Sequence, residues 1–329
     1  MIAFYFCYIF VMNWAENEVK LQTDFNEYDD MISLKQLHYA LAIEKTLHFK
    51  KAAEACNVSQ SALSNAMNEL EKQLGCTIFE RNNKQVLITN NGMQILNKAR
   101  KIKLEVTELL QISEINKFPF STPMTIGVIP TIGPYILPKI LPEVRKLYPD
   151  FKLKVIEGES HVLVDMIRGG ELDAAILALP YPINGLMSFD FWEEDFYLLF
   201  HKDERNNYLD EVTSEALDLD KLMLLKDEHC LKEHTLAVCR LESKAKYTDF
   251  DSASLHTLIQ MVARNLGTTI VPKMALDQLI HDKSELAVAH LNEPGPHRTI
   301  SLVSRPNFVR TEELITLKSI FTRGLVDNH

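Results

Sequence analysis

The stretch "LHFKKAAEACNVSQSALSNAMNELEKQLGCTIFERNNKQVLITNNG", residues 47–92, decides the fold of the N-terminal part of the chain. Its apolar spacing predicts a short helix over "KKAAEAC", a turn at "NVS" and a second helix over "SQSALSNAMNELEKQLG", which starts at a serine cap and stops at Gly75. "FERNNKQVLITNNG" then alternates polar and apolar residues and predicts a two-stranded wing. These are the parts of a winged helix-turn-helix, although a small helical bundle with no DNA role fits the periodicity equally well.

The charge of this region favours the first interpretation. The chain of 329 residues has a net charge of −10, whereas residues 50–103 contain nine Lys and Arg and four Glu, a local charge of +5. Phosphate contacts supply most of the affinity of a DNA-binding module, so a basic region within an acidic chain favours DNA binding. The turn of the wing would offer Arg81, Asn83 and Lys84 to the phosphates.

A further helix is predicted just before this stretch, over "SLKQLHYALAIEKTL". Ser33 is a natural N-cap for it. The residues expected near its apolar face are Leu34, Leu37, Leu41 and Leu47.

The order of these features resembles the winged helix-turn-helix of the LysR-type transcriptional regulators. The paired alanines, the "SQ" turn, the serine inside the second helix, "LEKQLG", "F-x-R" and "T-x-x-G" all match in order over about fifty residues. The resemblance implies that Arg81 meets a phosphate. Ser61 stands where the family usually has proline, and Asn68 where many relatives have a basic residue. The positions that the resemblance assigns to the major groove are Ser59, Gln60, Ser61 and Ser64.

The segment after the wing predicts a long helix with an apolar seam, formed by Ile95, Ala99, Ile102, Val106 and Leu109 at alternating spacings of four and three. Such a seam suits a dimerising linker helix, and a helix packed on its own domain is the alternative. "NKFPFSTP" ends the helix and marks a domain boundary. The expected domains are an extension (1–30), a winged helix-turn-helix (31–90), a linker and dimerisation helix (91–118) and a regulatory domain (119–329).

Beyond the boundary, strand and helix patterns alternate. "MTIGVIP" and "FKLKVIEG" read as strands, "YILPKILPEVRKLYP" as a helix with prolines at its ends, and "LHTLIQMVARNLGTTIVP" as a helix stopped by Gly267 and followed by a strand. The pattern predicts an α/β domain built around parallel sheets. The family resemblance implies two small α/β subdomains with a cleft between them, similar to periplasmic binding proteins.

The first 30 residues begin with the apolar run "MIAFYFCYIFVMNW". The run has no basic start and no small-residue cleavage site, and it is shorter than the roughly 20 residues of a membrane-spanning helix. We therefore expect neither secretion nor membrane insertion. The extension is expected to be disordered or to reflect a start placed too far upstream, with helical docking onto the body as the alternative.

Five cysteines without a regular framework are typical of a protein from a reducing compartment. Cys230 and Cys239 lie nine positions apart in "EHCLKEHTLAVCR", residues 228–240. Buried packing residues are the ordinary interpretation of such cysteines. His229, Cys230, His234 and Cys239 could also be read as zinc ligands, but their spacing matches no usual structural zinc pattern.

Within the family, the regulatory part resembles the peroxide-sensing members, through "GVIPTIGPYILPKILP", "DEHCLKEHTLAVC", "MVARNLGTTIVP" and "PHRTISLVSRP". This resemblance implies a reversible Cys230–Cys239 disulfide. Lys232 and Glu233 stand where the relatives have arginine and aspartate. A sensing thiol needs neighbours that lower its pKa and orient the peroxide. The residues expected to support it are Thr131, Ser160, His229, Glu233 and Arg298.

Each supporting residue also has an ordinary interpretation. Thr131 and Ser160 could cap helices, and Arg298 could be an exposed charge at a strand edge. Two other functions stay open: a LysR-type regulator that binds a small co-inducer in the cleft, and a thiol peroxidase, which the DNA-binding half argues against.

The expected protein is therefore a cytoplasmic transcription regulator and not an enzyme, with no cofactor and no metal. Its expected partners are operator DNA, further copies of itself in a dimer and a tetramer, RNA polymerase, and a thiol reductant such as glutaredoxin or thioredoxin. If residues 230–239 are helical when reduced, nine residues hold the two Cα atoms about 13 Å apart. A disulfide needs them roughly 4.4–6.8 Å apart, so "LKEHTLAV" must unwind before the bond forms.

Overall fold

The computed structural model describes residues 32–82, 85–115, 119–208, 210–227, 229–241, 254–280 and 285–326. The expectations for the extension 1–30 lie outside these residues. Contacts divide the chain into two compact units, Met1–Val106 and Thr107–His329, and each is described by itself.

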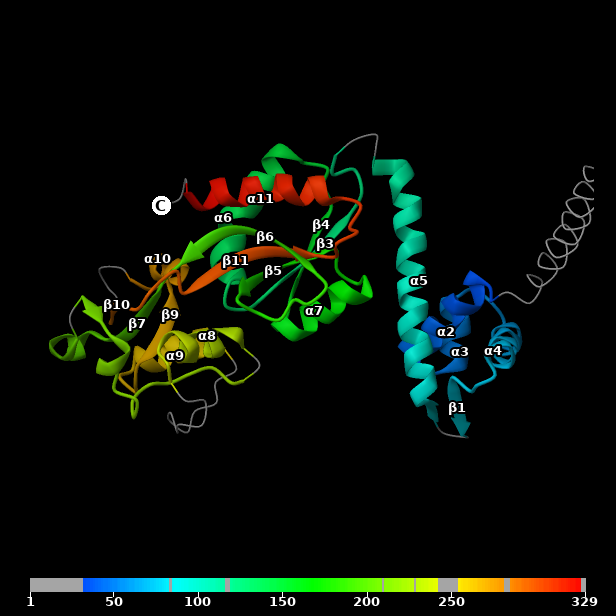
Figure 1. Ribbon diagram of the computed structural model, residues 1–329, viewed down its shortest axis with the longest axis horizontal. Coiled ribbons are helices and arrows are strands. Elements are labelled where there is room, and N and C mark those ends of the chain that lie inside the picture. The colour runs from blue at the N-terminus through cyan, green and yellow to red at the C-terminus, as the bar shows by residue number, and fades with distance from the viewer. Residues whose placement is uncertain are drawn as a thin grey trace, which may run out of the picture. The chain divides into compact units, whose positions relative to one another are not determined.

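The N-terminal unit is a small helical domain with a two-stranded wing (Figure 1). Ser33 caps the first helix, and a reciprocal bond with Gln36 completes a capping box. Ser59 caps α4, and Gly75 ends it in the left-handed conformation, with φ of 66°. The predicted winged helix-turn-helix is therefore confirmed. Its elements are α2 (Leu34–Thr46), α3 (Phe49–Ala55), α4 (Gln60–Leu74), β1 (Phe79–Asn82), β2 (Gln85–Ile88) and the start of α5 (Asn90–Ile115).

The predicted apolar face of α2 is wrong at its two ends. The buried stripe contains Leu37, Ala40 and Ile43, whereas Leu34 is 54% exposed and Leu47 is 50% exposed. Leu34 is the first helical residue and has neighbouring turns on only one side. Leu47 is the C-cap with φ of 46°, so it lies outside the helix and the helical period does not place it.

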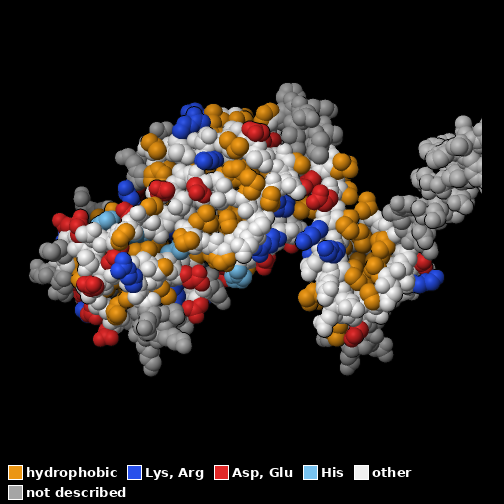
Figure 2. Space-filling view, viewed as in Figure 1, with side chains coloured by type: hydrophobic (Ala, Val, Ile, Leu, Met, Phe, Trp, Pro, Cys, Tyr) orange, Lys and Arg blue, Asp and Glu red, His pale blue; other side chains and the backbone are white. Residues whose placement is uncertain are grey.

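The predicted seam of α5 changes character along the helix. Near its start Ala99 is fully buried and Ile95 is partly buried, and both pack into the core of the N-terminal unit. Further along, Ile102 is 43% exposed and Leu109 is 66% exposed. The dimerising role of this exposed half remains a prediction. Figure 2 shows hydrophobic side chains gathered on the surface of the N-terminal unit, whose exposed large hydrophobic residues include Leu34, Leu47, Leu87 and Met93.

The second unit contains two subdomains, each built on one sheet. The first subdomain has a five-stranded sheet in the order β4-β3-β5-β11-β6. α6 and α11 pack together on one face of it and α7 covers the other (Figure 1), as expected when successive crossovers run in opposite directions. Its elements are β3 (Met124–Val128), α6 (Gly133–Leu147), β4 (Leu153–Glu157), α7 (Ser160–Gly169), β5 (Ala174–Leu179), β6 (Met187–Glu194), β11 (Arg298–Ser304) and α11 (Thr311–Val326).

The second subdomain has a four-stranded sheet in the order β8-β10-β7-β9. The chain enters it between β6 and β7 and leaves it between β10 and β11. α9 packs against β7 and β9. Its strands are β7 (Phe196–His201), β8 (Glu211–Val212), β9 (Thr269–Pro272) and β10 (Leu286–Leu291), and its α-helices are α8 (Cys230–Val238), α9 (Leu255–Val262) and α10 (Leu276–Leu279). Short 3-10 helices cover Lys202–Asn207, Ser214–Ala216 and Lys273–Ala275.

The predicted α/β architecture with two subdomains is confirmed, but the prediction of parallel sheets is wrong. β3 is parallel to β4 and β5, whereas β11 is antiparallel to both β5 and β6. β7 is antiparallel to β9 and β10. The reason is topological, because β11 returns from the second subdomain and enters the first sheet from the opposite end.

Two local details also differ from expectation. Pro138 and Pro142 lie inside α6 and not at its ends. Because Pro138 has no N–H, the carbonyl of Pro134 lacks its helical donor, and the side chain of Gln278 donates to it at 3.3 Å. α9 ends at Val262, so Gly267 does not stop it. In the part of the chain described here, no helix is long and apolar enough to cross a membrane.

Candidate functional site

Cys230 is the first residue of α8, and its side chain is only 4% exposed. His229 precedes it as the N-cap and is also buried. Ser160 approaches from the first subdomain as the first residue of α7, and its buried hydroxyl is hydrogen-bonded to Cys230. Glu159 is the N-cap of α7, so the capping interpretation of Ser160 is wrong. The thiol lies where the starts of two helices from different subdomains meet.

Arg298 brings a positive charge to this boundary from strand β11, which lies between β5 and β6. Its side chain is fully buried, so the interpretation as an exposed strand-edge charge is wrong. The guanidinium donates to the Thr131 hydroxyl at 3.4 Å and to the Thr131 carbonyl at 3.3 Å. Ile132, not Thr131, is the N-cap of α6. The structure therefore brings Thr131 and Arg298 into one buried network.

Glu194 completes this network, and sequence reasoning missed it. Its Oε1 accepts a 2.7 Å hydrogen bond from Nε of Arg298, and its Oε2 accepts another from the Met274 amide at 2.9 Å. Arg298 and Glu194 are direct partners across β11 and β6. Charged residues at the ends of two apolar strands were the available signal, but their pairing depends on the strand order, which a single sequence does not provide.

Burial dominates the electrostatics of Cys230. It raises the pKa of the thiol, while the Ser160 hydrogen bond and the charge of Arg298 act to lower it, and Glu233 acts to raise it. Ser160 and Arg298, two of the expected neighbours, do act to lower the pKa of Cys230, and desolvation outweighs them in this arrangement. The resting form of Cys230 is therefore the thiol.

Cys239 occupies the opposite end of the same helix, as the C-cap of α8. It is 3% exposed, and burial, reinforced by the charge of Glu293, raises the pKa of its thiol to about 12. Both cysteines are free thiols. Among the described residues, no hydroxyl or guanidinium acts to lower the pKa of Cys239, so the two thiols differ in how readily each can ionise.

His234 is a further buried residue on α8, which the sequence suggested only as a zinc ligand. Its Nε2 lies 2.8 Å from the Pro180 carbonyl, just beyond β5. Burial lowers the pKa of the imidazole to about 4, with Arg298 acting in the same direction. Among the described residues, no group of three or more His, Cys, Asp or Glu side chains is arranged to hold a metal ion.

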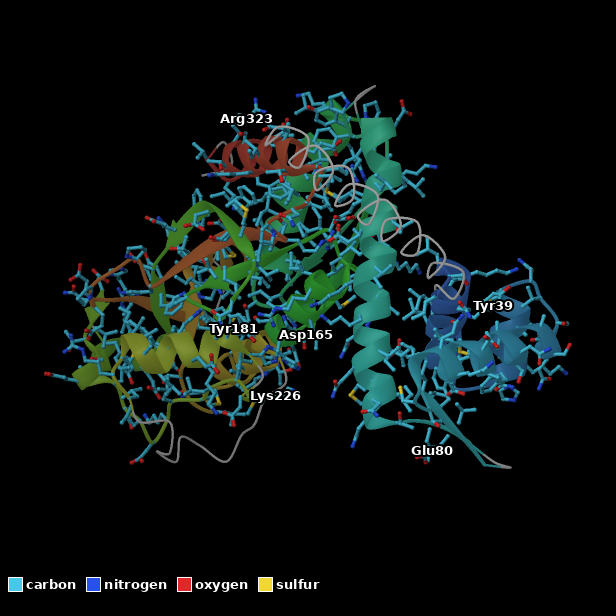
Figure 3. The ribbon with its side chains drawn as sticks, turned by 45° about the vertical axis from the view of Figure 1, so that its right-hand side comes forward. Tyr39, Glu80, Asp165, Tyr181, Lys226 and Arg323 are labelled. Atoms are coloured by element: carbon cyan, nitrogen blue, oxygen red, sulfur yellow. The ribbon has the colours of Figure 1, made fainter. Side chains whose placement is uncertain are left out.

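A salt bridge reinforces this boundary, since Nζ of Lys226 lies 3.5 Å from a carboxylate oxygen of Glu159. Asp165, Tyr181 and Lys226 lie together in the region where α7 approaches the segment before α8 (Figure 3). Glu233 is exposed on α8 and acts on the titration of Tyr181. The start of α8 is thus tied to the first subdomain at several points.

The candidate DNA interface lies on the first turn of α4. Ser59 caps the helix by accepting from the Ala62 amide at 3.2 Å, and its hydroxyl lies 3.1 Å from that of Ser61. Gln60 and Ser61 are exposed, and Ser64 is partly buried. Arg81 is on β1, but its side chain lies outside the described part of the structure, as do Asn83 and Lys84.

Glu71 of α4 fixes the start of the wing, a role that the sequence patterns did not indicate. One of its carboxylate oxygens accepts hydrogen bonds from the Ile78 amide at 2.7 Å and from the Phe79 amide at 3.0 Å. The wing is therefore anchored to the helix that the resemblance assigns to the major groove.

Comparison with known protein families gives two matches along the chain. Residues 34–93 match the family described as bacterial regulatory helix-turn-helix protein, lysR family, and residues 120–323 match the LysR substrate binding domain. The HTH-type transcriptional regulator EstR of Acinetobacter baylyi is 34% identical over 292 residues, covering 88% of this chain and 96% of the relative. The DNA-binding transcriptional dual regulator OxyR of Escherichia coli is 33% identical over 277 residues, covering 84% and 90%.

Solved structures give the same result. A full-length OxyR variant from Pseudomonas aeruginosa has a TM-score of 0.74 and 31% identity, and the match covers 88% of this chain and 95% of that one. A Corynebacterium glutamicum OxyR cysteine variant with hydrogen peroxide bound has a TM-score of 0.60 and 30% identity, covering 90% and 94%. The resemblance found in the sequence is confirmed, and the chain belongs to the LysR family of transcriptional regulators.

Proposed function

We propose that this protein is a DNA-binding transcription regulator that senses hydrogen peroxide through a reversible Cys230–Cys239 disulfide. The observation that carries the proposal is the pair of buried free thiols at opposite ends of α8. Within the described residues, a hydroxyl and a guanidinium act to lower the pKa of Cys230, and none acts on Cys239. The relatives named hydrogen peroxide-inducible genes activators and the peroxide-bound OxyR structure support it.

The chemistry proceeds in two balanced steps. The Cys230 thiolate attacks one oxygen of hydrogen peroxide, the O–O bond breaks, and the products are a sulfenic acid and hydroxide, which takes up the proton lost by the thiol. The Cys239 thiol then attacks the sulfenic sulfur, and a disulfide and water form. The two sulfurs together lose two electrons to the peroxide, and a thiol reductant such as glutaredoxin or thioredoxin returns them.

Each supporting residue has a proposed part in the first step. Arg298 stabilises the thiolate, and Ser160 and Thr131 present hydroxyls that orient the peroxide. His229 lines the site next to Cys230 in the chain. Glu233, exposed one turn along α8, opposes ionisation of Cys230 and so restrains the reaction.

The second step requires α8 to unwind. Cys230 and Cys239 bound a nine-residue helix, so their Cα atoms lie about 13 Å apart, against the roughly 4.4–6.8 Å that a disulfide requires. Leu231 is buried, and Leu236 and Val238 pack against the core, so unwinding moves apolar side chains out of their packing sites. Oxidation thereby selects between two arrangements of one segment.

The remaining proposals concern the turnover, cellular location and partners of the protein. The protein is oxidised once for each activation event, so it acts as a sensor and not as an enzyme that turns over. It works in the cytoplasm on promoter operators, as a dimer or as a tetramer assembled from two dimers, and communicates with RNA polymerase. The proposal requires no cofactor.

Mass spectrometry of the intact and digested protein tests the proposal. Treatment with a small excess of peroxide is expected to remove two hydrogen atoms and to link the peptides that contain Cys230 and Cys239, and dithiothreitol is expected to reverse both changes. A regulator that responds to a co-inducer would keep both thiols, and a zinc protein would carry the mass of the metal under native conditions. Either result would contradict thiol sensing.

DNA binding is expected to separate base contacts from phosphate contacts. Arg81→Ala should weaken binding to all sequences about equally and reduce its salt dependence, because the residue neutralises a phosphate. Gln60→Ala should instead lose discrimination between operator and random DNA, by about 1–3 kcal/mol if Gln60 makes a good base contact. Titrations on both DNAs at several salt concentrations measure this, with Lys146→Ala on α6 as the charge control. Equal losses of affinity and of specificity in both variants would contradict these roles.

A further inference from the structure

We propose that His234 is a latch that holds α8 in its helical, reduced arrangement and so sets how readily the Cys230–Cys239 disulfide closes. The inference rests on the proposed function. It assigns His234 a positioning role in the second chemical step, while the first step, the attack of Cys230 on peroxide, does not depend on it.

The geometry ties the middle of α8 to the other subdomain. His234 follows Cys230 by four residues, so both lie on the same face of the helix. Its ring is 4% exposed, and Nε2 lies 2.8 Å from the carbonyl oxygen of Pro180, which follows β5 of the first sheet. The imidazole of His234 thus forms a direct hydrogen bond between α8, which must unwind, and the end of β5, which belongs to a sheet that stays folded.

The bond fixes the state of the imidazole. A carbonyl oxygen only accepts, so Nε2 must carry the proton, and Nδ1 is then an acceptor in the neutral ring. Nδ1 is buried and receives no hydrogen bond from the described residues. His234 therefore makes one hydrogen bond while its other ring nitrogen is buried without one. The cost of the unpaired nitrogen offsets part of the gain from the bond, so the latch is weak enough to be released by a single oxidation event.

Release must accompany disulfide formation. His234 lies inside the segment closed by the two cysteines, and that segment cannot remain helical when they join. The same movement also withdraws Cys230 from Ser160. Ser160 is hydrogen-bonded to the reacting thiol itself, whereas the hydrogen bond of His234 is to the Pro180 carbonyl.

The latch couples the switch to pH. In the reduced protein, burial lowers the pKa of His234 to about 4, whereas a released histidine returns towards the ordinary value of 6.5. Arg298 on β11 is the charged group that acts on the ring, and it lowers the pKa, whereas the hydrogen bond to Pro180 acts to raise it. Tyr181 follows Pro180 in the chain, and Cys230 and Glu233 are the neighbouring titratable residues of α8. Because the folded pKa is the lower one, protonation below about pH 6.5 favours the released arrangement, and acid therefore favours the disulfide.

The decisive experiment uses the full-length chain equilibrated with dithiothreitol buffers. Exchange between the Cys230–Cys239 pair and dithiothreitol consumes no net proton at pH values below the thiol pKa values. Without a titrating latch, the equilibrium constant for the protein disulfide is therefore independent of pH. For the wild type, we expect the equilibrium constant for the disulfide to rise about tenfold between about pH 7.5 and about pH 5.5. His234→Gln retains a donor for the Pro180 carbonyl but cannot titrate, and its equilibrium is expected to stay flat.

His234→Phe removes the hydrogen bond while filling the space. Its disulfide is expected to close faster and to be favoured about three- to tenfold over that of the wild type at neutral pH, with His234→Gln close to the wild type. In a Cys239→Ser background, sulfenic acid formation at Cys230 should proceed at the wild-type rate in all variants. His256→Phe, which replaces an exposed histidine of α9, is the matched control and should change nothing.

The outcomes for the two proposals are separate. If the disulfide forms but its equilibrium is flat with pH in the wild type, and His234→Phe closes at the wild-type rate, the latch is refuted and peroxide sensing stands. If His234→Phe does not fold, the latch is still tested by comparing how the disulfide equilibrium constant of the wild type and that of His234→Gln depend on pH. If peroxide produces no Cys230–Cys239 bond in the wild type, the proposed function itself fails.

Discussion

Cys230→Ser is expected to abolish the response to peroxide, which is the largest effect that any single substitution in the sensing unit should have. The serine hydroxyl stays protonated and cannot displace hydroxide from peroxide, so no sulfenic acid forms. Cys239→Ser should still form a sulfenic acid at Cys230, because Ser160 and Arg298 remain beside it, but no bond to the other end of α8 can lock it. A dimedone trap followed by mass spectrometry distinguishes the two variants, and operator binding with and without peroxide reports the response.

Cys76→Ser is the matched control for both variants, since Cys76 is a partly buried free thiol in the N-terminal unit. Cys56→Ser is a second control, and burial raises the pKa of its thiol. Both should respond to peroxide as the wild type does. A full response in Cys230→Ser, or its loss in Cys76→Ser, would contradict the assignment of the sensing thiol.

The local rules of the sequence predicted the DNA-binding unit well, because caps and turns are set by neighbouring residues. Ser33, Ser59 and Gly75 begin or end their helices as expected. The same rules failed at Gly267, which was predicted to stop α9 but instead lies five residues beyond its end. A Cβ at that position would lie 2.6 Å from the Lys221 carbonyl, so the glycine allows a close approach of two chain segments and does not end α9.

The candidate site was only partly predictable, and the missing residues share one cause. Cys230 was identified through the family resemblance, which rests on the contiguous stretch "DEHCLKEHTLAVC", whereas its spacing from Cys239 alone left its role open. Glu194 is separated from Arg298 by the whole second subdomain, and only the insertion of β11 beside β6 makes them partners. The raised pKa of Cys230 was missed for the same reason, because desolvation depends on how the two subdomains close over the thiol.

Glu194→Gln is expected to have two opposite effects, both arising from the charge left on Arg298. The pair is fully buried, and removing one partner of such a pair costs about 3–5 kcal/mol in the free energy of unfolding. The uncompensated guanidinium should at the same time lower the pKa of Cys230 more strongly, so alkylation of this thiol by iodoacetamide should be faster at a given pH. Chemical denaturation and the pH profile of alkylation, followed in a Cys239→Ser background, measure the two effects.

A second buried pair in the same unit separates the thiol effect from simple destabilisation. At the start of α11, a carboxylate oxygen of Glu313 lies 2.5 Å from a guanidinium nitrogen of Arg310. Glu313→Gln should therefore cost a similar free energy of unfolding without changing the alkylation profile of Cys230. Replacing both Glu194 and Arg298 by apolar residues of similar volume should recover most of the stability, because no unpaired charge remains, and should raise the pKa of Cys230 above that of the wild type. Equal alkylation profiles in Glu194→Gln and Glu313→Gln would show that Arg298 does not act on the thiol, and its role would then be confined to joining β11 to β6.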